Sequence, residues 1–352
     1  MSGNHTECQS ESVGDPMEKI YLVTGAYGHL GNVIIRNLLS ERQKVRALVL
    51  PNDINDMFAL MPVTIFRGDV TKKETLIPFF EHTENEELIV IHCAGIISIY
   101  AQYNKLTHDV NVTGTKNMVD LAVEYGVKKF VYVSSVHALK EKPKGEIISE
   151  QDYFDPSDVE GDYAKTKAEA SQYVLNAQDK LDVTIVHPSG IIGPYDFYES
   201  NTTKLFESYI QGTLRVIVKG GYDFVDVRDV ASGILAAAEK GRRGECYILS
   251  NRYITIKDMF DALSIIGSIK RIRVILPVWI PKMVAPILEK HYQKKKQVPL
   301  FTGYSLSTIK SNSYYTHQKA TNELGYQPRS ILETMSSIYQ WGVCEEGNKT
   351  HD

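Results

Sequence analysis

A strand-like apolar run ending in a glycine-rich turn is the feature that most constrains this chain. Residues 19–25 read KIYLVTG, and the turn TGAYGHLG then places Gly25, Gly28 and Gly31 at the start of a segment with helical periodicity. Glycine permits a sharp turn, close approach of a ligand to the backbone, and close packing of helix on strand. Unpaired N–H groups at the helix N-terminus favour an anion. An ordinary tight turn is the alternative, but the place of this turn in a strand–helix series favours a dinucleotide pyrophosphate site.

Runs of β-branched and apolar residues alternate with helix-period segments as far as residue 190. Further strands are predicted at 44–50, 63–70, 87–95, 128–135 and 181–190, with helices at 29–43, 72–83, 104–126 and 161–177. This alternation predicts parallel βαβ units in an α/β fold, a Rossmann-type doubly wound parallel sheet covered on both faces.

The alternation of strands and helices ends at residue 190, and helical segments dominate after it. They are predicted at 202–211, 228–240, 256–267, 280–295 and 329–341. We expect a disordered tail at 1–16, an NAD(P)-binding Rossmann domain at 17–190, and a smaller, mixed, mainly substrate-binding lobe at 191–345. A helix around 228–240 and a nearby strand are expected to return to the first domain.

Composition narrows the class of protein. The 352 residues carry a net charge of −4, which argues against binding to nucleic acid or to an acidic membrane. Four scattered cysteines form no metal or disulfide pattern, so we predict no metal and a reducing, cytoplasmic setting. No signal peptide is evident.

The apolar stretch 274–288 contains three prolines and is too short to span a bilayer. A helix over a substrate cavity is favoured there over a peripheral membrane contact.

Five tyrosines precede a lysine by four positions, so this spacing alone proves nothing. The pairs are Tyr125/Lys129, Tyr163/Lys167, Tyr253/Lys257, Tyr292/Lys296 and Tyr315/Lys319. Among them, Tyr163 and Lys167 begin a predicted helix directly after the fifth strand, so both side chains share one helix face. Ser134 and Ser135 close that strand. The position predicts a catalytic pair.

Several motifs occur in the order found in one superfamily. Besides GxxGxxG, the chain has GDV at 68–70, HCAG at 92–95, NVTGT at 111–115 and VSS at 133–135. From about residue 19 to 341 it resembles the extended short-chain dehydrogenases/reductases. Its motif residues are most similar to those of the dihydroflavonol reductase and 3β-hydroxysteroid dehydrogenase branch.

The resemblance implies roles for individual residues. Catalytic residues would be Ser135, Tyr163, Lys167 and Asn111. Cofactor-binding residues would be Gly25, Tyr27, Gly28, His29, Leu30, Gly31, Asp69, Val70, Ala94, Gly95, Tyr163, Lys167 and Pro188. Ser135 is favoured over Ser134 because the family's serine is the second of the pair. For Asn111, an amide that satisfies helix backbone is an equal alternative.

The chemistry explains why these residue types occur together. An unperturbed tyrosine has a pKa of ~10, too high for an effective base at neutral pH. The ammonium of Lys167 and an oxidised nicotinamide would favour the phenolate of Tyr163 and lower that pKa. Ser135 would donate to the substrate oxygen. His92, His137 and His187 are interpreted as structural histidines, since no carboxylate-rich pattern accompanies them.

The cofactor is expected to be NAD or NADP. In the resembled branch an arginine often stands where this chain has Leu50, followed by Pro51. Its absence removes a partner for the 2′-phosphate of NADP. Asp53 lies slightly late for the ribose, and Arg46 lies inside the strand. The sequence therefore leans toward NAD.

Three functions remain open. An oxidoreductase interconverting a ketone and a secondary alcohol on a small apolar substrate is favoured. A sugar-nucleotide epimerase or dehydratase is the first alternative, opposed by Tyr222 where those relatives carry an arginine and by Ser189 and Gly190 where they often carry an asparagine. A non-catalytic nucleotide-binding regulator is the second. By analogy, helices 104–126 and 161–177 predict a homodimer.

Overall fold

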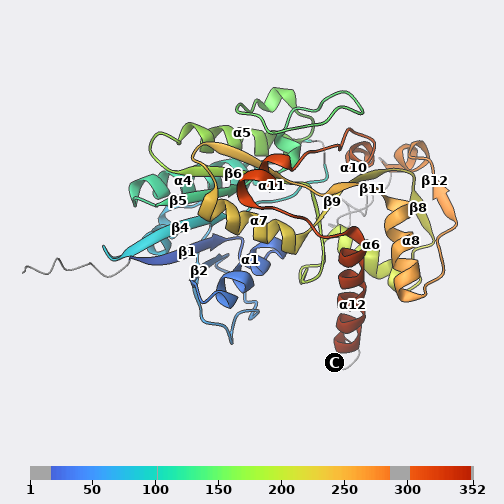
Figure 1. The fold of residues 1–352 in the computed structure, drawn as a ribbon, viewed down its shortest axis with the longest axis horizontal. Coiled ribbons are helices and arrows are strands. Elements are labelled where there is room, and N and C mark those ends of the chain that lie inside the picture. Colours follow the sequence, from blue (N-terminus) through green and yellow to red (C-terminus); the bar gives the residue numbers. More distant parts are fainter. Residues whose placement is uncertain (1–16, 101, 286–301, 350–352) are drawn as a thin grey trace, which may run out of the picture.

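A seven-stranded sheet forms the centre of the larger lobe of the molecule (Figure 1). The computed structural model describes residues 17–100, 102–285 and 302–349, with side chains to residue 343. The strands are β1 (Glu18–Thr24), β2 (Lys44–Val49), β3 (Val63–Arg67), β4 (Glu86–His92), β5 (Lys129–Val133), β6 (Val183–Pro188) and β10 (Glu245–Leu249). Their order is β3-β2-β1-β4-β5-β6-β10, and every pairing is parallel. The predicted Rossmann-type fold is confirmed.

Helices cover both faces of this sheet. One face carries α1 (His29–Ser40), α7 (Val227–Lys240) and α11 (Gln318–Leu324), and the other α2 (Ile77–Phe80), α4 (Thr115–Glu124) and α5 (Asp162–Asn176). Within β1, Leu22 packs into one core and Val23 into the other, and both are 0% exposed. Burial on both faces explains why the strands are near-continuous apolar runs.

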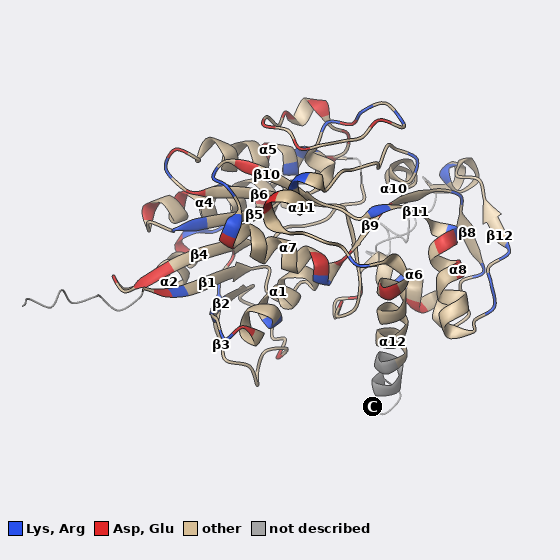
Figure 2. Ribbon diagram, in the orientation of Figure 1, with Lys and Arg blue, Asp and Glu red and all other residues tan. Residues whose placement is uncertain are grey.

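The chain after residue 190 builds a second, smaller lobe on the carboxyl side of the sheet. It contains α6 (Asn201–Ile210), β8 (Val216–Val218), α8 (Ile256–Gly267), β12 (Val274–Leu276), α10 (Gly303–Thr308) and α12 (Ile331–Lys349). A three-stranded sheet of β7 (Gly190–Ile192), β9 (Gly221–Asp226) and β11 (Arg252–Thr255) joins it to the first lobe. Figure 2 shows acidic and basic residues interspersed over both lobes.

Parts of the predicted small lobe fall outside the described residues. Residues 279–285 are helical, whereas 286–301 are not described, so the predicted helix 280–295 and the apolar stretch 274–288 are only partly covered. The predicted tail 1–16 also lies outside. Among the described helices, none is long and apolar enough to cross a membrane.

Two predicted helices differ from the structure. The segment 72–83 is a 3₁₀ turn (Lys73–Thr75) followed by α2, because Pro78 lacks an N–H and fits only the first turn of a helix. The segment 104–126 divides into α3 (Lys105–His108), a π-helical turn (Asp109–Gly114) and α4. In that turn the Asn111 carbonyl accepts the Thr115 hydroxyl at 2.7 Å. Such π turns often occur at functional sites.

Candidate active site

The glycine turn at the carboxyl end of β1 forms a tight backbone cradle. Gly25 has φ +65°, and a Cβ there would lie 2.9 Å from the Ala94 nitrogen. A Cβ on Gly31 would lie 2.1 Å from the Gly25 carbonyl oxygen. Gly28 is the N-cap of α1 and is exposed. The backbone is therefore shaped for the close approach of a pyrophosphate to the first turn of α1.

Side chains of the turn have partners within the protein. The Tyr27 hydroxyl donates to the Asn55 carbonyl at 2.6 Å, and His29 Nε2 donates to the Pro194 carbonyl at 2.9 Å. Leu30 packs in the core below α1. The groups that these three residues could offer to a cofactor are therefore mainly those of the backbone.

The GDV motif lies beyond β3 and holds its own loop. Asp69 Oδ1 accepts from the Thr71 amide at 3.0 Å and the Thr71 hydroxyl at 2.8 Å. Val70 is buried against Gly114, where a Cβ would lie 2.7 Å from Val70 Cγ2. The motif is thereby fixed between β3 and the helix that contains Asn111.

The loop after β2 has two neighbours that the sequence interpretation missed. Leu50 is exposed, and Asp53 accepts a 2.7 Å hydrogen bond from the Tyr198 hydroxyl of the small lobe. Arg67, the last residue of β3, donates to the Asp53 carbonyl at 2.6 Å. Arg46 instead reaches the carbonyls of Phe79 and Glu81, away from this loop. The 145-residue separation of Tyr198 and Asp53 left no local signal of their contact.

Tyr163, Ser135 and Lys167 meet where α5 begins beside the end of β5. All three are buried, at 8%, 7% and 4% exposure. Lys167 Nζ donates to the Val133 carbonyl at 2.8 Å and lies 4.9 Å from the centre of the Tyr132 ring. Any Cβ at Gly95 would approach that Nζ to 3.4 Å. The loop containing Ala94 and Gly95 thus passes directly over the lysine.

The two adjacent serines have different surroundings. The Ser134 hydroxyl is 2.7 Å from the Ser171 hydroxyl in the core against α5. The Ser135 hydroxyl accepts from the His137 amide at 3.2 Å and lies near enough to the Tyr163 phenol to lower its pKa. The geometry brings Ser135, and not Ser134, to Tyr163.

Burial dominates the titration of this pair. It raises the pKa of Tyr163 to about 12, and the nearby Ser135 hydroxyl opposes that shift. Burial also lowers the pKa of Lys167 to about 8. The sequence predicts a lowered pKa for Tyr163, whereas the protein alone raises it, because desolvation of the phenolate exceeds any help from the lysine. Tyr163 is consequently a proton-bearing phenol at neutral pH.

Asn111 ties the site together from the π-helical turn. Its Oδ1 accepts from the Ile96 amide at 2.8 Å, and its Nδ2 donates to the Ile96 carbonyl and to the Thr166 hydroxyl, each at 3.0 Å. The Thr166 hydroxyl donates to the Tyr163 carbonyl at 2.8 Å. The amide joins the loop after β4 to α5, so it contacts more than the backbone of its own helix.

His92 continues this network toward the glycine turn. Thr115 gives its hydroxyl hydrogen to Asn111, so it accepts from His92 Nε2 at 3.0 Å. Burial lowers the pKa of His92 to about 3, which leaves a neutral ring whose Nδ1 accepts from the Thr24 hydroxyl at 2.8 Å. His92 is a satisfied structural histidine.

Aromatic side chains face Tyr163 from the direction of the small lobe. The His137 ring lies edge-on to Tyr163, with centroids 6.0 Å apart, and is stacked on Tyr222 at 5.8 Å. The Tyr222 hydroxyl is 3.2 Å from His137 Nε2 and 3.4 Å from the Tyr315 hydroxyl. Burial lowers the pKa of His137 to about 4, so His137, Tyr222 and Tyr315 form an uncharged aromatic wall at neutral pH. This placement of His137 was not predicted.

Pro188 ends β6 beside a buried carboxyl group. The adjacent Ser189 hydroxyl donates to Asp223 Oδ1 at 2.6 Å, and the Asn251 amide donates to the same oxygen at 3.0 Å. Among the described atoms, Asp223 Oδ2 has no partner. Burial raises the pKa of Asp223 to about 6.

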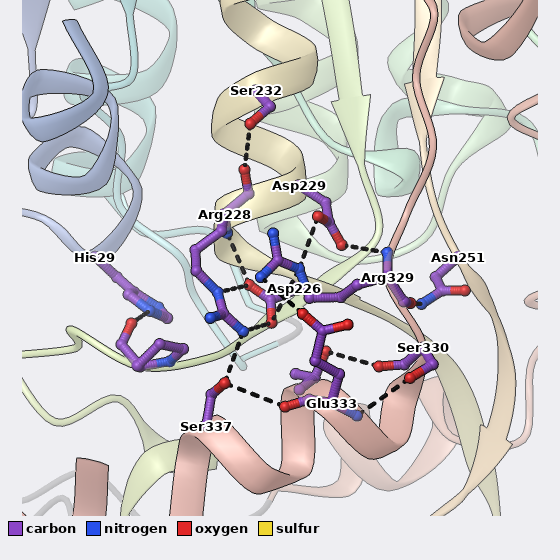
Figure 3. Close-up of polar contacts among 12 residues, drawn as sticks. His29, Asp226, Arg228, Asp229, Ser232, Asn251, Arg329, Ser330, Glu333 and Ser337 are labelled. Atoms are coloured by element: carbon purple, nitrogen blue, oxygen red, sulfur yellow. Dashed lines mark hydrogen bonds and ion pairs between the residues drawn. The ribbon is translucent and has the colours of Figure 1, made fainter. Parts of the chain in front are cut away.

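A network of ion pairs joins α7 to α12, as Figure 3 shows. Asp226 caps α7 and binds the Arg228 guanidinium through both carboxylate oxygens, at 2.9 and 2.7 Å. Asp229 accepts from the backbone and side chain of Arg329, both at 2.8 Å. These residues brace the two lobes. In the described part of the chain, no cluster of His, Cys, Asp and Glu could hold a metal ion.

The model of one family matches residues 21–250, and its description is the NAD dependent epimerase/dehydratase family. The chain belongs to this family. The predicted resemblance to extended short-chain dehydrogenases/reductases is thereby confirmed, as is the prediction of an NAD(P)-dependent oxidoreductase that uses NAD or NADP.

Individual relatives show how far this likeness extends. Sterol demethylase protein B of Methylococcus capsulatus is 31% identical over 91% of this chain and 97% of its own. Mouse 3 beta-hydroxysteroid dehydrogenase type 7 is 27% identical over 94% and 97%. UDP-glucose 4-epimerase of Thermotoga maritima superposes with a TM-score of 0.73 over 95% and 100%, at 20% identity, which shows a shared fold alone.

Proposed function

We propose that this protein interconverts a ketone and a secondary alcohol on a small, apolar substrate. The observation that carries the proposal is the uncharged aromatic wall of His137, Tyr222 and Tyr315 facing Tyr163. Such a surface fits an apolar molecule and offers no cation to a diphosphate. The names of the sterol and steroid relatives agree with an apolar substrate. In this proposal the lobe after residue 190 supplies most of the substrate contacts.

The proposed chemistry assigns one task to each residue. A bound nicotinamide would supply or accept the hydride. Ser135 holds the substrate oxygen, and Tyr163 donates its phenolic proton to that oxygen during reduction. Its raised pKa keeps the proton available at neutral pH. Oxidation needs the phenolate, which the positive charge of Lys167 would favour.

The cradle around the glycine turn would hold the cofactor. Gly25, Gly28 and Gly31 would leave room for the pyrophosphate, and Lys167 beneath Gly95 would bind the nicotinamide ribose. Asp69 and Val70 would meet the adenine, and Pro188 the carboxamide. Asp53 is the acceptor available to the adenosine ribose, so NAD remains favoured, although Arg67 supplies a nearby positive charge.

A sugar-nucleotide epimerase or dehydratase is the second candidate. The epimerase-like fold supports it. Tyr222 argues against it, because this buried tyrosine occupies the place of a diphosphate-binding arginine and is already bonded to His137.

The direct experiment is turnover of apolar ketones and alcohols with each cofactor. We predict steroid or flavonoid ketone reduction by the wild-type protein, and a loss of about 10²–10⁴-fold in kcat for Tyr163→Phe with cofactor affinity retained. Tyr153→Phe is the matched control, since Tyr153 is 61% exposed. Unchanged turnover in Tyr163→Phe contradicts the catalytic assignment, and epimerisation of a UDP-sugar contradicts the substrate class.

We also propose a cytoplasmic homodimer that pairs through the outer faces of α4 and α5. This rests on analogy with relatives. Light scattering at micromolar concentration would detect twice the 39.7 kDa chain mass, and a monomer would contradict the proposal.

A further inference from the structure

His187 lies on β6 next to the backbone of Ser135. Its side chain is 0% exposed, and Nδ1 is 3.0 Å from the Ser135 carbonyl oxygen. A carbonyl only accepts, so Nδ1 carries the hydrogen. Burial lowers the pKa of His187 to about 4, and the neutral ring therefore has a bare Nε2. Among the described atoms this Nε2 has no partner, so the single hydrogen bond of the ring goes to Ser135.

The β5–β6 ladder ends beside this hydrogen bond. β5 and β6 pair as far as Val133 and Val186, and the Ser134 amide donates to the Val186 carbonyl at 2.8 Å. Alternate residues of a strand face the same neighbour, so the next donor from β6 would be residue 188. Pro188 has no N–H, and the ladder ends. The missing donor would have faced the Ser134 carbonyl. The His187 side chain donates instead to the next carbonyl, that of Ser135, which also accepts from the Ala138 amide at 3.0 Å.

The ring that supplies this donor is itself held in place. Phe154 stacks on His187 with centroids 5.3 Å apart and an interplanar angle of 29°. Ser135 adopts an extended conformation (φ −161°, ψ 154°) and caps the 3₁₀ turn Val136–Ala138. A donor on its carbonyl restrains this backbone conformation, and the His137 amide holds the Ser135 hydroxyl at 3.2 Å.

We propose that His187 is a positioning residue for the reaction: it orients Ser135, and through Ser135 the phenol of Tyr163. The inference rests on the proposed function for its effect on turnover. Its structural part, the orientation of Ser135 toward Tyr163, concerns this chain alone. A displacement of about 1 Å at such a site is enough to cost on the order of 10²-fold in rate.

Two substitutions separate positioning from packing. In His187→Asn the side-chain Nδ2 takes the place of Nδ1–H, whereas His187→Leu keeps the volume and removes the donor. We expect His187→Leu to lower kcat about 10–100-fold, with KM and cofactor affinity within about twofold of wild type, and His187→Asn to recover most of that loss. Equal losses in both variants, or none in either, would overturn the proposal.

A second readout needs no substrate. The ¹³Cζ chemical shift of Tyr163 at pH 8, assigned by its absence in Tyr163→Phe, reports hydrogen bonding at the phenol. We expect His187→Leu to move it and His187→Asn to leave it in place; the same shift in all three proteins would contradict the proposal. If the wild type reduces no ketone, the proposed function fails while this comparison still decides the role of His187. Should His187→Leu not fold, His187→Met removes the same donor.

Discussion

The groups between the glycine turn and Tyr163 form continuous chains of hydrogen bonds, whereas those between Tyr163 and the small lobe are mainly aromatic rings. On the first side, hydrogen bonds connect β1 to α5 through Thr24, His92, Thr115 and Asn111. On the second, His137 and Tyr222 are stacked and neutral. Satisfied polar networks fix geometry, while apolar walls exclude water and charge. Under the proposed function, the first side would hold the cofactor and the second would select a substrate by shape and polarity.

The largest effect on this comparison is expected from Ser135→Ala, at the boundary of the two sides. Loss of a donor to the substrate oxygen should lower kcat about 10²–10³-fold. The Ser135 hydroxyl lowers the pKa of Tyr163, so its removal should also move the basic limb of the rate of reduction to higher pH. Ser134→Ala is the control, because that hydroxyl meets Ser171 and should leave kcat near wild type. Equal losses of kcat in the two variants would contradict the assignment of Ser135 as the serine that contacts the substrate.

Asp223→Asn tests whether a buried negative charge on the aromatic side destabilises the folded protein. The pKa of Asp223 is raised from 3.8 to about 6 by burial, so the folded state binds the proton more tightly than the unfolded chain. The wild type therefore loses stability as pH rises from about 4 through about 6. We expect the variant to be more stable than wild type at pH 8 by on the order of 2–3 kcal/mol, with that gain shrinking toward pH 4. Urea unfolding at both pH values measures it, and a pH-independent difference contradicts it.

Leu50→Arg probes the far end of the cofactor side and should have the smallest effect. An arginine after β2 adds a partner for a 2′-phosphate, so preference should shift toward NADP by about tenfold. Ratios of kcat/KM for the two cofactors measure the shift, with Leu50→Met as the control for changing the side chain alone. An unchanged ratio would mean that the 2′-hydroxyl lies elsewhere, with the Arg67 side of the loop as the next candidate.

The sequence predicts the first lobe well because its signals are local. The glycine turn, the apolar strands and the place of Tyr163 after the fifth strand all follow from periodicity and order along the chain. The π-helical turn was missed because it arises from the hydroxyl of Thr115 competing for the Asn111 carbonyl, which propensity does not register.

Contacts between distant segments could not be predicted in the same way. Tyr198 meets Asp53, and Tyr222 meets His137, only after the two lobes have packed. The pKa of Tyr163 also depends on burial, which raises it in the protein without cofactor, whereas the prediction of a lowered pKa included the charge of an oxidised nicotinamide. His187 was expected to be fully satisfied, yet one of its ring nitrogens has no partner among the described atoms.

The central claim, a dehydrogenase with an apolar substrate, is tested most directly by cofactor exchange. The freshly purified protein is desalted, and absorbance in the reduced-nicotinamide band is followed before and after titration with cofactor. We predict that cofactor washes out and rebinds, since a dehydrogenase must release it at every turnover. Cofactor that remains bound through desalting would instead fit an epimerase or dehydratase that regenerates it in place, and would contradict the role given to Tyr222.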